Sequence, residues 1–128
     1  MPFYKNSQQA ADVFGGLFTI LSEDPQAMAV MKSSGLKVAI KHKDPEYLIG
    51  FDADGLHTDL TGFTPNVRIA MSCDTAHKLW LGELLMPVAL ATGRVRVRGS
   101  VPKILEFIPV MRPAFDRYPS LAAAHGVS

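Results

Sequence analysis

Few side chains in this sequence have the types and spacing that metal or acid–base chemistry needs. No two of the four histidines stand at the spacing of a helical zinc site, and His77, on an expected helix, has no second ligand nearby. Asp52, Asp54 and Gly55 superficially resemble a calcium loop, which needs glycine at its sixth position and glutamate at its twelfth. Here glycine is fourth and Phe63 is twelfth, so we interpret Asp54-Gly55 as a hairpin turn.

Cys73 is the single cysteine, and it stands between an apolar strand and the start of a helix at Asp74. A helix dipole at such a position would lower the thiol pKa and make the side chain reactive. No general base accompanies it, so a buried small hydrophobic side chain is the favoured interpretation. The sequence also lacks a Gly-x-Ser-x-Gly motif, a phosphate loop and a dinucleotide fingerprint. We therefore predict a protein that is not an enzyme and has no cofactor, and keep catalysis by Cys73 or His77 as a third alternative.

Arg94, Arg96 and Arg98 alternate with valines, which predicts a strand with arginines on one face. The favoured interpretation of that face is an ordinary solvated surface. The alternative is contact with an anionic headgroup, a phosphate or, transiently, a membrane surface. We expect no nucleic-acid partner, because the net charge is only +1 and few aromatic residues interleave with these arginines.

Large apolar side chains come mostly from the expected helices. Periodicity alone favours an ordinary core, but six methionines in so short a chain suit a pocket that adapts to a flexible apolar ligand. We expect Ser72, Arg96 and Arg98 to form a polar mouth. The predicted cavity residues are Phe14, Phe18, Met28, Met31, Leu79, Trp80, Leu84, Met86, Phe107, Met111 and Phe115.

The elements that position these residues follow from periodicity and capping signals. A helix is expected over 7–22, with Ser7 as N-cap, and a second from Asp24-Pro25 to Gly35. Alternating apolar residues then predict four strands joined by three successive antiparallel pairings. These strands lie within residues 36–41, 47–51, 56–60 and 67–71.

The last third returns to helical spacing and makes the pattern α+β. Two short helices follow Asp74 and Met86, then the arginine strand, then a closing helix capped by Ser100. Residues 120–128 are small and polar enough to predict a mobile tail.

Composition describes an ordinary globular chain. Its 128 residues suit one domain, 1–128, with a core over about 8–119. The single cysteine suggests a reducing compartment, and no signal peptide or long apolar run is visible. We expect a cytoplasmic protein.

Four segments together resemble the type-2 sterol carrier protein domain. They are Val67–Ser72, Leu79-Trp80-x-Gly82, 89–93 and Val95-Arg96-Val97-Arg98-Gly99, within a similar order of elements from about Gln8 to Phe115. The resemblance implies a five-stranded, mostly antiparallel sheet, covered on one face by helices, with an apolar tunnel between them. The chain departs from the family at 81–87, which is bulkier and more apolar than in many members.

The resemblance also implies function. Such domains bind or transfer sterols, fatty acids, fatty acyl-CoA or isoprenoid and quinone-type lipids without catalysis. The specific prediction is that Trp80 lies beside an internal apolar cavity. The second alternative is an accessory protein that forms a homodimer or binds a partner enzyme of lipid or quinone metabolism through exposed Leu84, Leu85 and Met86.

Overall fold

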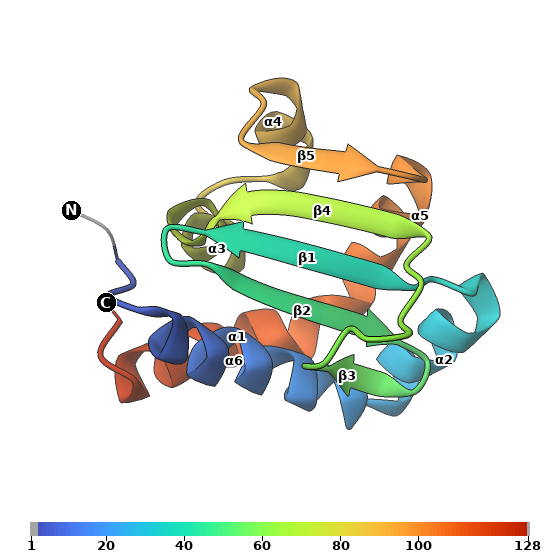
Figure 1. The fold of residues 1–128 in the computed structure, drawn as a ribbon, viewed down its shortest axis with the longest axis horizontal. Helices are drawn as coiled ribbons and strands as arrows, with labels where there is room; N and C mark the ends of the chain where they lie inside the picture. Colours follow the sequence, from blue (N-terminus) through green and yellow to red (C-terminus); the bar gives the residue numbers. More distant parts are fainter. Residues whose placement is uncertain (1–2, 128) are drawn as a thin grey trace.

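Five strands form one mixed sheet, and helices gather on one of its faces (Figure 1). The computed structural model describes residues 3–127. The α+β class predicted from the periodicity is confirmed. In chain order the elements are α1 (Ser7–Ser22), α2 (Pro25–Ser34), β1 (Val38–Lys43), β2 (Tyr47–Asp52), β3 (Gly55–His57), β4 (Val67–Ser72), α3 (Cys73–Trp80), α4 (Met86–Ala91), β5 (Val95–Arg98), α5 (Val101–Phe107), the 3₁₀ helix η1 (Ile108–Met111) and α6 (Arg112–Ala124).

The strand order β3-β2-β1-β4-β5 differs from the simple meander expected from the sequence. The pairs β1–β2, β2–β3 and β4–β5 are antiparallel, but β4 runs parallel to β1 and does not pair with β3. A parallel pair needs a connection longer than a hairpin, and the β2–β3 hairpin with the loop over 58–66 supplies it. The prediction of a third antiparallel pairing, between β3 and β4, was therefore wrong.

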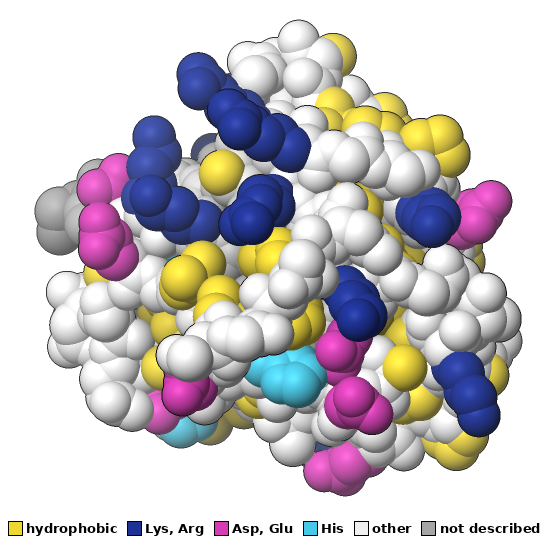
Figure 2. Space-filling model, turned by 45° about the vertical axis from the view of Figure 1, so that its right-hand side comes forward, with side chains coloured by type: hydrophobic (Ala, Val, Ile, Leu, Met, Phe, Trp, Pro, Cys, Tyr) yellow, Lys and Arg dark blue, Asp and Glu magenta, His cyan; other side chains and the backbone are white. Residues whose placement is uncertain are grey.

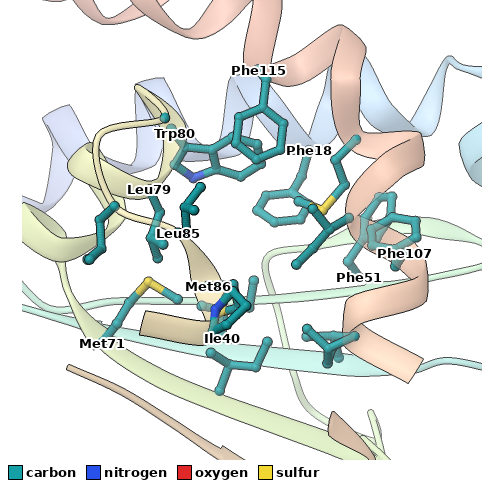
Figure 3. Close-up of a pocket in the computed structure, with 18 of the residues that line it drawn as sticks. Phe18, Ile40, Phe51, Met71, Leu79, Trp80, Leu85, Met86, Phe107 and Phe115 are labelled. Atoms are coloured by element: carbon teal, nitrogen blue, oxygen red, sulfur yellow. The ribbon is translucent and has the colours of Figure 1, made fainter. Parts of the chain in front are cut away.

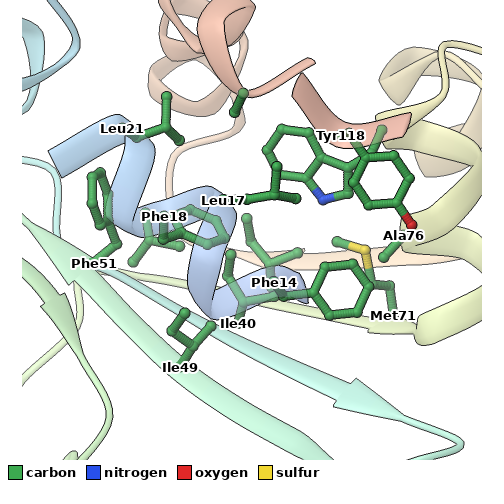
Figure 4. Packing of buried hydrophobic residues seen from close by; sticks show 14 of the residues in the cluster. Phe14, Leu17, Phe18, Leu21, Ile40, Ile49, Phe51, Met71, Ala76 and Tyr118 are labelled. Carbon is green, nitrogen blue, oxygen red and sulfur yellow. The ribbon is translucent and has the colours of Figure 1, made fainter. Parts of the chain in front are cut away.

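The register of the central strands puts their apolar side chains side by side. Val38 lies opposite Val67 and Ile40 opposite Ile69. Successive side chains of a strand point to opposite faces, so one face of β1 and β4 is apolar and turned towards the helices. Figure 4 shows Ile40, Ile49 and Phe51 of the sheet packed beneath the side chains of α1.

Capping residues begin the first two helices and end the second, largely as the sequence indicated. The side chain of Asp24 accepts a hydrogen bond from Ala27 N at 2.8 Å, and Gly35 ends α2 with a φ of 66°. The cap of α1 is Asn6, whose Oδ1 accepts from Gln9 N at 2.8 Å, rather than the predicted Ser7. Asparagine and serine cap equally well, so their relative preference could not separate the two neighbours.

The predicted mobile tail is instead packed structure up to residue 127. Helix α6 continues to Ala124 with Ala122 buried, and Val127 is 1% exposed. Small side chains allow α6 to lie close against α1, where a Cβ on Gly16 would come within 3.1 Å of Leu121. Close packing is therefore the reason for glycine inside α1. The last residue of the predicted tail lies outside the described residues.

A buried polar cluster ties the segment just before α1 to α6. The hydroxyls of Tyr4 and Tyr118 lie 2.7 Å apart, and His77 Nδ1 lies 2.6 Å from the Tyr118 hydroxyl. Both tyrosines are about 1% exposed or less. Buried polar groups are costly unless they are hydrogen-bonded, so this cluster favours the one arrangement of Tyr4, His77 and Tyr118 in which all three are bonded.

None of the helices found within residues 3–127 has the length and apolar run needed to cross a bilayer.

Candidate ligand-binding cavity

A cavity of about 270 Å³ lies between the sheet and the helices. Nearly all of its wall is aliphatic, aromatic or thioether, and no Lys, Arg, Asp or Glu lines it (Figure 3). The lining residues are Phe18, Val38, Ile40, His42, Phe51, Ile69, Met71, Leu79, Trp80, Gly82, Leu84, Leu85, Met86, Pro87, Ile104, Phe107, Ile108, Met111 and Phe115. Such a space accepts an apolar molecule and offers little to an ion.

Trp80 lies on the cavity wall, where the sequence analysis placed it. Its ring packs against Phe115 with centroids 4.9 Å apart and meets Phe18 edge-on at 6.1 Å, so aromatic contacts fix its orientation (Figure 3). The predicted residues that line the cavity are Phe18, Leu79, Trp80, Leu84, Met86, Phe107, Met111 and Phe115. That these side chains contact a ligand stays a prediction.

Three predicted cavity residues lie in the packed core instead. Phe14 is fully buried and stacks on His42 with centroids 4.5 Å apart, which leaves no space at that turn of α1. Met31 is also fully buried, and Met28 is half-buried against the core. Both belong to α2, which packs against α1, α5 and η1 beyond the cavity. Helical spacing shows which side of a helix is apolar, but not whether that side meets a neighbour or a void.

Sequence reasoning missed the sheet side of the cavity. The prediction drew only on helices and their ends, whereas Ile40 and His42 of β1, Phe51 of β2, and Ile69 of β4 also line the space. The alternation along β1 was a signal that could have found them, because it marks the face that must be covered by helices.

The predicted polar mouth is not at the cavity. Ser72 Oγ caps α3 by accepting from Thr75 N at 3.1 Å. Arg96 pairs with Ala70 and Arg98 with Arg68, on the sheet face opposite the cavity. Strand alternation sends the valines of β5 inward, with Val95 2% exposed, and therefore sends the arginines outward.

His42 is the only residue lining the cavity whose side chain can ionise, among those the structure describes. Its ring is 2% exposed and stacks between Phe14 and Tyr47. Burial lowers the pKa of His42 to about 4, and the hydrogen bond to the Tyr47 carbonyl opposes this only in part. The ring is therefore neutral near pH 7.

Cys73 is a buried structural side chain, as the favoured interpretation expected. It is fully buried, does not line the cavity, and its Sγ–H donates to the Pro45 carbonyl at 3.2 Å. Burial, reinforced by the nearby Asp74 and Asp44 carboxylates, raises the pKa of this thiol to about 12. A thiol that stays protonated is a poor nucleophile, so the geometry disfavours catalysis by Cys73.

No group of three or more His, Cys, Asp or Glu side chains within residues 3–127 is placed to hold a metal ion. Asp52 serves the hairpin instead, because its Oδ1 accepts from Asp54 N at 2.9 Å and lies 2.8 Å from His57 Nε2. The hairpin interpretation of this segment is confirmed.

The segment between α3 and α4 forms the edge of the cavity towards solvent. Leu85 lines the cavity and is nevertheless 65% exposed. Val88 on α4 is 49% exposed, whereas Leu84 is buried. The cavity therefore opens to solvent beside a short apolar rim. Because Leu84 is buried, it does not belong to the exposed contact patch that the sequence predicted.

Comparison with known proteins finds solved structures with a similar fold, but no match to a family model or a curated protein. Sterol carrier protein 2 from Yarrowia lipolytica superimposes with a TM-score of 0.69 at 14% identity, covering 91% of this chain and 99% of that one. The sterol carrier protein domain 2 of Helicoverpa armigera gives 0.63 at 18% identity, covering 84% and 92%. A ubiquinone synthesis protein, UbiJ-SCP2, gives 0.58 at 15%, covering 84% and 95%. The chain therefore has the fold of sterol carrier protein 2, with the five-stranded sheet and helical cover that the resemblance implied.

Proposed function

We propose that this protein binds a lipid or similar hydrophobic molecule in its cavity, without catalysis, and transfers or presents it. The observation that carries the proposal is a cavity of about 270 Å³ between sheet and helices whose lining holds no charged side chain. The names of the structural neighbours, sterol carriers and a ubiquinone synthesis protein, support the same class of ligand. Sterols, fatty acids, fatty acyl-CoA and isoprenoid or quinone-type lipids are the ligands to test.

The physical basis of binding is burial of ligand hydrocarbon. Each methylene group moved from water into the cavity stabilises the complex by about 0.8 kcal/mol, so affinity rises about fourfold with each group enclosed. Three methionines, Met71, Met86 and Met111, line the space. Their flexible side chains let the wall adapt to ligands of different shape.

Trp80 supplies the test. Its indole lines the cavity and is 8% exposed, so a bound lipid changes its surroundings. We expect a saturable shift in tryptophan emission and a higher melting temperature with at least one member of a panel of sterols, fatty acids and isoprenoid lipids. N-acetyl-tryptophanamide with the same lipids controls for quenching in solution. No response in either measurement across the panel would refute the proposal.

We extend this proposal to contact with an anionic membrane. The basic sheet face, on the side of the sheet away from the cavity, consists of Lys41, Lys43, Arg68, Arg94, Arg96 and Arg98. All six are exposed, and none forms an ion pair with an acidic side chain in the described part of the chain. Figure 2 shows lysine and arginine side chains gathered over one part of the surface. Leu48, 49% exposed and opposite Lys41 in the register, adds an apolar contact.

Each such cation near an anionic bilayer contributes about 1 kcal/mol at moderate salt. We expect sedimentation with phosphatidylserine-containing vesicles, no sedimentation with phosphatidylcholine alone, and release by salt. Lys41→Glu should weaken the binding roughly thirtyfold, because it loses one attraction and adds a repulsion, about 2 kcal/mol together. Lys32→Glu, the same change on exposed α2, is the matched control. Equal sedimentation with both kinds of vesicle would refute membrane contact through this face.

The second candidate function is that of an accessory protein that docks through α4. The observation in its favour is the exposure of Leu85 and Val88, at 65% and 49%. Light scattering of the purified protein, alone and with Leu85→Asp, tests self-association directly. A dimer that Leu85→Asp dissociates, together with a cavity that takes up no lipid, would favour this function over lipid binding.

A further inference from the structure

One nitrogen of His42, a residue of the cavity wall, has no hydrogen bond to any described residue. Nδ1 lies 3.1 Å from the carbonyl oxygen of Tyr47, while Nε2 has no hydrogen bond to any described residue. Within residues 3–127, no fully enclosed side-chain nitrogen or oxygen lacks a partner. Nε2 has no partner, so it is not fully enclosed, and the cavity that this 2% exposed residue lines is the free space beside it.

The hydrogen bond of Nδ1 sets the chemistry of Nε2. A carbonyl oxygen only accepts, so Nδ1 carries the proton and donates it to Tyr47. In a neutral ring the other nitrogen then has a lone pair and no hydrogen, and burial keeps the ring neutral near pH 7. The stacked rings of Phe14 and Tyr47 hold the imidazole, so this acceptor is preoriented.

The rest of the wall makes this acceptor selective. No lysine or arginine lines the cavity, so an enclosed carboxylate or phosphate would lose its hydration with no cation to replace it. The indole N–H of Trp80 has no partner among the described residues and lies on the wall (Figure 3). One N–H donor does not compensate a full charge, but it suits a neutral oxygen.

We propose that the cavity prefers hydrophobic ligands with a neutral hydrogen-bond donor, foremost a hydroxyl group, which donates to His42 Nε2. The inference rests on the proposed lipid binding and deepens it by naming the head group, the hydroxyl of a long-chain alcohol. A ligand without a donor leaves Nε2 desolvated and unpaired, which corresponds to a roughly tenfold loss of affinity.

The experiment compares three ligands of one chain length, 1-decanol, decyl methyl ether and decanoate, by Trp80 fluorescence at pH 7.4. The ether keeps the decyl chain and the oxygen and replaces the donor hydrogen by a methyl group, whose burial alone would favour the ether. We expect wild-type protein to bind decanol about tenfold more tightly than the ether and to bind decanoate most weakly. In His42→Phe, which keeps a ring between Phe14 and Tyr47, the ether should bind at least as tightly as decanol. His125→Phe, outside the cavity, is the control.

Nitrogen-15 NMR of wild-type protein gives a second measurement that needs no variant. Decanol should shift the His42 Nε2 resonance in the direction of hydrogen bonding, and the ether should not. If decanol and ether bind with equal affinity and leave that resonance equally unchanged, or if decanoate binds most tightly, the inference is overturned while lipid binding stands. If none of these ligands or the wider lipid panel binds, both proposals fall.

Discussion

The size of the cavity sets a limit on the length of chain that it can enclose. A volume of about 270 Å³, at about 30 Å³ for a group the size of a water molecule or methylene, holds roughly nine groups. Each enclosed methylene contributes about 0.8 kcal/mol, which is close to a fourfold gain in affinity. In a series of n-alkanols, affinity should therefore rise about fourfold per carbon up to roughly nine or ten carbons and then level off.

A side chain that grows into the cavity should move this limit. Ile40→Phe enlarges a side chain on the cavity wall by nearly the volume of one methylene group, ~30 Å³, so the levelling point should fall by about one carbon. Leu48→Phe makes the same addition on β2, where the side chain is 49% exposed and outside the cavity. This matched control should leave the series unchanged.

The assay is a Trp80 fluorescence titration of hexanol to tetradecanol with wild type and both variants, each checked for folding by circular dichroism. A slope that continues unbroken to tetradecanol would show that the chain is not enclosed. An identical levelling point in wild type and Ile40→Phe would show that the ligand lies elsewhere. Either result refutes the reasoning from the cavity volume.

Three further predictions concern buried groups. The pKa of His42 is about 4 in the folded chain and near 6.5 unfolded, so the unfolded state binds more protons between these values. The contribution of His42 to stability should be complete above pH 6.5 and fall by roughly 3 kcal/mol as the pH drops towards 4. The free energy of unfolding, measured with urea at several pH values, should therefore depend less steeply on pH in His42→Phe than in wild type. Equal pH dependence in the two proteins would contradict the assignment. Tyr118→Phe removes the hydroxyl between Tyr4 and His77 and should cost roughly 1–3 kcal/mol in the same assay, whereas an unchanged midpoint would deny the cluster a stabilising role. Cys73, with a pKa of about 12, should not react with a thiol reagent at pH 8 until the chain is unfolded in urea; rapid labelling of folded protein would mean that the thiol is accessible.

Local signals in the sequence predicted most of the elements because their causes are local. Asp24 before Pro25 caps a helix, and Gly35 adopts the left-handed conformation that ends it. The Asp54-Gly55 signal marks the β2–β3 hairpin, in which Gly55 pairs with Asp52 at the end of the turn. Each signal depends on neighbouring residues alone. The one-residue error at Ser7 has the same origin, since Asn6 is an equally good cap.

The order of the strands needed information beyond the chain neighbourhood. Short turns favoured a meander, but β3 has only three residues and a parallel partner for β1 was available further along the chain. Pairing β1 with β4 joins Val38 to Val67 and Ile40 to Ile69 and builds one apolar surface for the helices to cover. A rule that favours short connections does not take into account the free energy gained by burying that apolar surface.

The sequence by itself determined that this is an α+β chain with an excess of large apolar side chains and few groups suited to catalysis, because composition and periodicity are properties of the linear chain. Only the tertiary structure decided which apolar residues face a void. Phe14 and Phe18 share one stripe of α1, yet His42 fills the space beside Phe14 and the cavity lies beside Phe18. It also turned Arg96 and Arg98 away from the cavity and left His42 as its polar group. A cavity is space that other side chains leave unfilled, so it depends on the packing of every element at once.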